Sequence, residues 1–139
     1  MSEIQNFRDL EAWQRGIELV LIAYELADRL PSTEKYELAR QIRRAATSVP
    51  ANVAEGHERR GRGYLHHVRI ALGSLSELHT HVEIAVRLKY LTANDVASFL
   101  QKGTSTTQLL HGLRRALRRK LLAKAAATTM CLILMALAL

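Results

Sequence analysis

Apolar residues recur at intervals of three and four along most of the chain, and this spacing limits the fold more than any other feature. The first run predicts a helix over about residues 6–30 with a heptad stripe on one face. The stripe consists of Leu10, Trp13, Ile17, Val20, Tyr24 and Ala27. No stretch alternates with the period of two that a strand requires, and only two prolines interrupt the 139 residues. We therefore predict an all-α protein with a single core.

A second helix should run from 33 to about 59. Pro31 ends the first helix, and Ser32 or Thr33 can cap the second. Pro50 lies inside this second helix. Because proline lacks the backbone N–H and crowds the carbonyl four residues earlier, the helix must bend at Pro50 or a new helix must start there.

Two more helices follow. Two glycines predict a turn at 61–63, after which a third helix covers about 63–90. Thr92 begins a fourth helix, with Asp95 in the place of the usual glutamate of a capping box. The expected inward residues are Leu38, Ile42, Ala45, Val49 and Val53 on the second helix, Leu65, Val68, Leu72, Leu75, Val82 and Val86 on the third, and Val96, Leu100, Leu110, Leu113, Leu117 and Leu121 on the fourth. Short connections at 31–32, 60–63 and 91–92 predict an antiparallel up-down-up-down four-helix bundle.

Polar residues gather near Pro50. Ser48, Asn52 and Glu55 share one face of the second helix, and Ser74 and Glu77 on the third helix could close a polar cleft with them. The favoured interpretation is a structural hydrogen-bond network that sets helix register. A partner-binding surface is the alternative, and acid–base chemistry would require a proton-bearing carboxyl group aligned with a substrate.

Basic residues are concentrated near the end of the fourth helix. Residues 114–124 hold six of the 20 lysines and arginines and no acid: Arg114, Arg115, Arg118, Arg119, Lys120 and Lys124. A second group lies at the predicted turn: Arg59, Arg60 and Arg62. Arginine binds phosphate through two parallel hydrogen bonds, so we expect nucleic-acid contact at these positions. The alternative is a solvated basic face.

No catalytic or metal-binding pattern stands out. His66, His67, His79 and His81 lack the spacing of ligands on one helical face, and we predict no metal and no cofactor. Cys131 is the only cysteine, which fits a reducing cytoplasm and excludes an internal disulfide. The N-terminus lacks the apolar core of a signal peptide. We expect a cytoplasmic, non-enzymatic protein.

The sequence resembles the four-helix-bundle family of 23S ribosomal-RNA intervening-sequence proteins over about residues 5–120. The matching segments, in order, are 7–10, 13–14, 30–31, Glu34, 36–38, 41–46, 48–56, 71–78 and 90–91. The resemblance implies an antiparallel four-helix bundle without an established enzymatic activity. Bundles of this kind are associated with pentameric rings and with nucleic-acid binding.

The tail lies outside this resemblance. We divide the chain into a bundle domain, residues 1–122, and an apolar C-terminal tail, residues 123–139. Its uncharged part, 125–139, has 15 residues against the roughly 20 that a membrane-spanning helix needs, so we predict that it does not cross a membrane. Attachment to a membrane surface through Lys124 and the preceding arginines is the less favoured alternative. The favoured one is that the tail extends the fourth helix and packs against protein.

Two functional hypotheses remain. The first is a self-assembling bundle that binds RNA or DNA non-specifically through its basic residues. The second is a purely structural or protein-interaction module. Apolar residues outside the stripes, namely Leu21, Ile22, Ile84 and Ala85, favour a homo-oligomer. A pentamer is implied by the resemblance alone.

Overall fold

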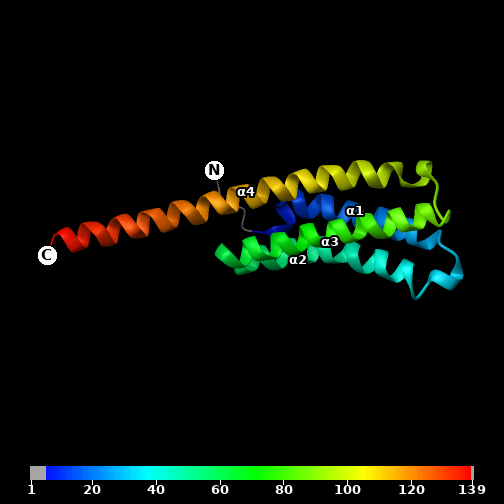
Figure 1. Ribbon diagram of the computed structural model, residues 1–139, viewed down its shortest axis with the longest axis horizontal. Helices are drawn as coiled ribbons and strands as arrows, with labels where there is room; N and C mark the ends of the chain where they lie inside the picture. Colours follow the sequence, from blue (N-terminus) through cyan, green and yellow to red (C-terminus); the bar gives the residue numbers. More distant parts are fainter. Residues whose placement is uncertain (1–5, 139) are drawn as a thin grey trace.

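The computed structural model describes residues 6–138, and within that range it consists of helices and their connections (Figure 1). The helices are α1 (Glu11–Asp28), α2 (Leu38–Arg59), α3 (Gly61–Arg87) and α4 (Ala93–Leu137). Short 3₁₀ turns, η1 (Phe7–Asp9) and η2 (Ser32–Glu34), precede α1 and α2. Sequential helices run antiparallel, and α4 packs against both α3 and α1. The predicted up-down-up-down four-helix bundle is confirmed.

The first two helices begin later than predicted, because side chains near their starts stabilise turns instead. Asn6 accepts a hydrogen bond from the backbone N–H of Arg8 at 2.9 Å, which caps η1 rather than a long helix. The carboxylate of Glu34 accepts the backbone N–H of Leu38 at 3.3 Å, so the polypeptide reaches α2 through η2 and a turn. The connection between α1 and α2 therefore covers 29–37, and neither Ser32 nor Thr33 caps α2.

The predicted turn at 61–63 is wrong. Arg60 alone connects α2 to α3, and Gly61 to Gly63 form the first turn of α3. Arg60 has a φ of 56° and Gly61 a φ of 50°. Glycine adopts this left-handed conformation without a steric penalty, whereas arginine does so at some cost. The reversal is thus tighter than a three-residue turn, and it keeps Arg60 at the end of the bundle.

Helix α2 continues through Pro50, so a new helix does not start there. The proline is buried against α1, where Gly16 faces it. A Cβ atom on residue 16 would lie 3.2 Å from the Cβ of Pro50. The absence of a side chain at Gly16 therefore lets the two helices approach closely, and the apolar ring of Pro50 becomes part of the core.

The inward face of α1 is rotated relative to the predicted stripe. Tyr24 is 40% exposed, and Trp13, Ile17 and Val20 are half-buried. The buried positions are Ala12, Gly16, Leu19, Ala23, Leu26 and Ala27. Both stripes have intervals of three and four, so spacing alone does not choose between them. The stripe of smaller residues faces inward because α2 packs closely against it.

The register of α4 differs from the prediction in the same way. Leu100 is 48% exposed, whereas its neighbour Phe99 is fully buried. The inward positions continue with Gly103, Thr106 and Leu110. Thr106 is buried without an unsatisfied hydroxyl group, because its Oγ1 donates to the carbonyl oxygen of Lys102 at 2.8 Å.

Helix α4 begins as predicted and extends far beyond the bundle (Figure 1). Asp95 accepts the backbone N–H of Thr92 at 2.8 Å, and Thr92 Oγ1 accepts the N–H of Asp95 at 3.2 Å, which confirms the capping box. The tail extends α4, but every residue from 122 to 138 is exposed. None of these residues is buried by another described part of the chain, and packing of the tail against protein stays a prediction. By length and composition alone, α4 is able to cross a membrane.

Candidate functional site

A groove at the end of the bundle brings together two basic groups that are far apart in the sequence. It lies where α4 leaves the other helices and encloses about 390 Å³. Arg60 from the reversal between α2 and α3 lines it together with Lys120 and Lys124 from α4. Its apolar lining consists of Leu10, Tyr64, Leu113, Leu117 and Leu121. We call this the cationic groove, because its charged residues are three cations.

Tyr64 and His57 form the bundle side of this groove. The Tyr64 side chain is 8% exposed, and its hydroxyl group has no hydrogen-bond partner among the described residues. Burial raises the pKa of Tyr64 to about 12, so the phenol stays neutral. The ring of His57 meets it edge-on, with 5.9 Å between ring centroids. A largely apolar wall therefore faces the cations of α4.

The four arginines of α4 lie outside the cationic groove. Arg114 lines a separate surface pocket against α3, next to His79 and His111. Arg115, Arg118 and Arg119 are exposed. On a helical projection Arg115 and Arg119 point away from Leu117 and Leu121, which face the groove, and Arg118 lies at the side. Cations thus surround α4 at this level instead of forming one stripe.

The second predicted basic group is only partly available to a ligand. Arg59 is already paired with Glu55, at 2.7 Å between Nη2 and Oε1. This hydrogen bond lowers the pKa of Glu55 below its usual range. Arg60 and Arg62 are exposed at the same end of the bundle. Of the three arginines, Arg60 is the one that shares a site with α4.

The polar residues near Pro50 form a hydrogen-bond network between α2 and α3. The hydroxyl oxygens of Ser48 and Ser74 lie 2.8 Å apart. Asn52 Nδ2 donates to the backbone oxygen of Ser48 at 2.9 Å and to its Oγ at 3.1 Å. Its Oδ1 faces His67 Nδ1 at 2.9 Å. The structure therefore brings Ser48, Asn52 and Ser74 together as predicted.

His67 is the member of this network that the sequence analysis missed. It lies fifteen residues after Asn52, on the neighbouring helix. Its Nε2 lies 3.6 Å from Glu55 Oε1, which links Glu55 to the network. Glu77 does not belong to it, because this exposed side chain lies 3.4 Å from His81 on its own helix. The available signal for His67 was its polar side chain in the second turn of α3, on the side that faces α2.

We expect Asn52→Leu to destabilise the fold by roughly 1–3 kcal/mol. The amide of Asn52 joins Ser48 to His67. Leucine would leave the largely buried Nδ1 of His67 without its partner, whereas Ser48 Oγ would keep Ser74. Thermal and urea unfolding of the two proteins measure the difference. An unchanged stability together with a lost binding activity would assign this network to a partner and not to the fold.

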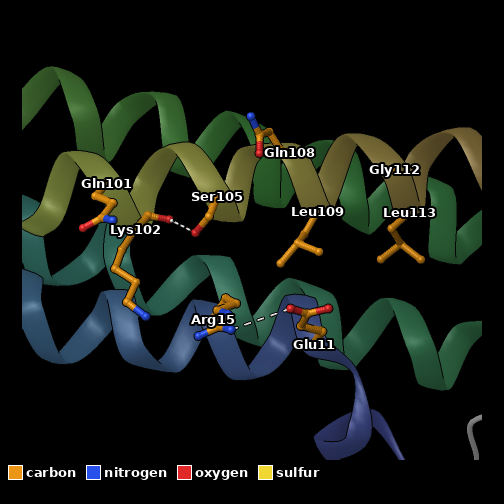
Figure 2. A pocket seen from close by; sticks show the side chains of 9 residues that line it. All are labelled: Glu11, Arg15, Gln101, Lys102, Ser105, Gln108, Leu109, Gly112 and Leu113. Carbon is orange, nitrogen blue, oxygen red and sulfur yellow. Dashed lines mark hydrogen bonds and ion pairs between the residues drawn. The ribbon is translucent and has the colours of Figure 1, made fainter.

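A second and larger pocket lies between α1 and α4 (Figure 2). It encloses about 750 Å³, and Glu11 and Arg15 on α1 face Leu109 and Leu113 on α4 across it. Its charges are used within the chain, since Arg15 pairs with Glu11 and Glu18. Lys102 also pairs with Glu18, and these two cations lower the pKa of Glu18. The charged residues around this pocket therefore join α1 to α4.

No three of the His, Cys, Asp and Glu residues within 6–138 are grouped so that they could hold a metal ion. Cys131 is exposed in the tail. The carboxylate nearest to the polar network, Glu55, is held by Arg59 in its ionised form, which does not suit a proton donor. Among the described residues, the polar network therefore contains neither a metal-binding cluster nor a carboxyl group suited to donate a proton.

Comparison with known proteins places residues 8–112 within the model of one family, described as 23S rRNA-intervening sequence protein. A solved structure of similar fold is a protein of unknown function from the S23 ribosomal protein family of Bacteroides thetaiotaomicron. The two chains are 23% identical, with a TM-score of 0.69 over 75% of this chain and 95% of the other. No protein of curated function matches the sequence.

Proposed function

The chain belongs to the 23S rRNA-intervening sequence protein family, and we propose that it is a non-enzymatic bundle that binds RNA or DNA phosphates through its cationic end. We define the cationic end as Arg60, Arg62 and the six basic residues of 114–124. The family has no indicated catalytic activity. Binding would be independent of base sequence, because contacts to phosphate position a protein without reading bases.

One observation carries this proposal: the fold places Arg60 in the same groove as Lys120 and Lys124. Two basic groups thereby act as one surface, although about 60 residues separate them. No Asp or Glu occurs after Asp95. Within α4 the cations of 114–124 therefore have no acidic neighbour one helical turn away. Such a surface attracts polyanions over a distance set by the ionic strength.

The salt dependence of binding tests this proposal. We expect the full chain to bind a short DNA or RNA duplex at low salt and to lose affinity steeply as salt rises. For duplex DNA, the slope of log K against log salt should be roughly −0.9 for each phosphate neutralised. Fluorescence anisotropy of a labelled duplex gives this slope. Absence of binding at low salt would leave the structural or interaction module as the function.

We also propose that the chain self-assembles. Leu21 on α1 is 62% exposed, and Ile84 on α3 is exposed as well. Ile22 is half-buried, whereas Ala85 is fully buried in the core and cannot contribute to an interface, which corrects its assignment. Leu88 and Tyr36 add exposed apolar area. Exposed apolar side chains that gather in patches are typical of interfaces between subunits. The number five for the ring stays a prediction from the family resemblance.

Sedimentation of the full chain tests assembly. We expect a species several times heavier than the 15.6 kDa chain at micromolar concentration. Leu21→Lys combined with Ile84→Lys should shift the equilibrium towards the single chain, because it buries two charges in the interface. A wild-type species of 15.6 kDa would refute assembly, while a dimer or tetramer would refute only fivefold symmetry.

A further inference from the structure

The end of α4 is exposed to solvent within the described part of the chain. Residues 122–138, which we call the apolar segment, are all exposed, although they include Leu122, Met130, Leu132, Ile133, Leu134 and Leu137. Figure 1 shows this part of the helix projecting away from the bundle. We propose that the apolar segment inserts into a lipid bilayer and anchors the bundle at an anionic membrane surface.

The distribution of large side chains around the segment selects lipid as the occupant. At 100° per residue, the side chains of 130, 132, 133, 134, 135 and 137 point in directions all around the helix axis. The bundle part of α4 instead has one buried stripe, from Val96 to Leu110. A protein partner would cover one side of the segment and leave the opposite leucines in water. A helix that is apolar on every side is typical of a membrane environment.

The threonine hydroxyl groups of the segment are already satisfied. Thr128 Oγ1 donates to the backbone oxygen of Lys124, and Thr129 Oγ1 donates to that of Ala125, each at 3.0 Å. The segment is continuous helix up to Leu137, so its interior backbone groups also pair within the helix. A bilayer core offers no water, and every polar group placed there needs an internal partner. The segment meets this requirement without a second chain.

Its length also fits. Its sixteen helical residues, 122–137, extend about 24 Å, against a hydrocarbon thickness of about 30 Å. In the sequence, the uncharged run covers only residues 125–139. The structure shows the exposed helix starting before Lys124, whose long side chain can place its ammonium group in the headgroup layer. Thinning of the bilayer accommodates a difference of a few ångströms between the helix length and the hydrocarbon thickness.

Cations lie where lipid headgroups would be. Along the helix, Lys120 and Arg119 lie within about 8 Å of Lys124, which matches the depth of about 5–8 Å of one headgroup layer, and Arg118 lies just beyond it. Arg60 lies at the same level, because it shares the cationic groove with Lys120 and Lys124. Each basic residue near an anionic surface adds attraction. Arg114 and Arg115 lie roughly 15 Å from Lys124, beyond the headgroups, so this anchor does not depend on nucleic-acid binding.

Vesicle flotation tests the anchor. The full chain is synthesised cell-free in the presence of phosphatidylcholine vesicles, with or without phosphatidylglycerol. We expect it to float with the vesicles and to bind more tightly when phosphatidylglycerol is present. A polarity-sensitive dye on Cys131, the only cysteine, should shift to the blue and be quenched by lipid-borne quenchers. A dye that stays in water, or equal binding to both kinds of vesicle, would overturn the proposal.

A pair of lysine substitutions separates insertion from surface attraction. Leu132→Lys with Met135→Lys should reduce vesicle binding at least tenfold, because lysine is disfavoured in the bilayer core. Simple electrostatic binding would instead gain from the added charge, and that result contradicts insertion. The matched control is Ile70→Lys with Leu100→Lys, which adds the same charge at exposed apolar positions of the bundle and should leave binding unchanged. If the wild-type chain does not bind vesicles and the segment variant loses self-association, another copy of the chain covers the segment, and the membrane anchor is refuted.

Discussion

Replacing Arg114, Arg115, Arg118 and Arg119 together by glutamine is expected to lower the affinity for duplex DNA by about ten- to 10³-fold at roughly 0.1 M salt. The range follows from counterion release, in which each lost phosphate contact removes about 0.9 from the slope of log K against log salt. All four side chains lie on the part of α4 without acidic neighbours, and three of them are exposed. The decrease in the steepness of the salt slope, divided by about 0.9, gives the number of these four arginines that contact phosphates.

A matched variant controls for the loss of net charge. Arg40, Arg44, Arg87 and Lys89 are four exposed cations, and they belong to the start of α2 and the end of α3. These helix ends lie opposite the reversal between α2 and α3 (Figure 1). Replacing them by glutamine removes the same charge from the other end of the bundle, and the salt slope should change little. Equal losses from both variants would show that binding follows net charge and not the cationic end.

Phe99→Ala is expected to destabilise the bundle by about 3–5 kcal/mol, the usual result of deleting a buried aromatic ring. Phe99 is fully buried on α4, and its ring lies 5.0 Å from that of His79 on α3. Burial beside this ring also lowers the pKa of His79. The substitution would leave a cavity between α3 and α4. Urea unfolding followed by circular dichroism measures the change.

Leu100→Ala provides the comparison. Leu100 is the next residue of the same helix but is largely exposed, so its truncation should change stability by only about 0.5 kcal/mol. The heptad pattern of the sequence assigns the larger effect to Leu100, whereas the structure assigns it to Phe99. A larger loss of stability for Leu100→Ala would mean that α4 is rotated by about one residue, or 100°, about its axis.

Local features of the sequence were sufficient to predict the fold class. Intervals of three and four identify helices because they follow the helix repeat, which each segment has by itself. The capping box was predictable for the same reason, since Thr92 and Asp95 bond within one turn. Pro50, in contrast, permitted both a bend and a new helix start. Only the structure shows that α2 continues through Pro50 and that the ring packs against Gly16 of α1.

By itself the sequence determined that there are four helices, that they alternate in direction, and that the cations cluster near residue 120. Those properties depend on neighbours within a few turns. Tertiary structure alone decided which of two equally spaced stripes on α1 faces inward, that Phe99 and not Leu100 fills the core, and that His67 joins Asn52. It alone placed Arg60 beside Lys120 and Lys124. The physical reason is that these outcomes depend on how the side chains of different helices fill the space between them. The spacing of apolar residues along one helix does not determine that packing.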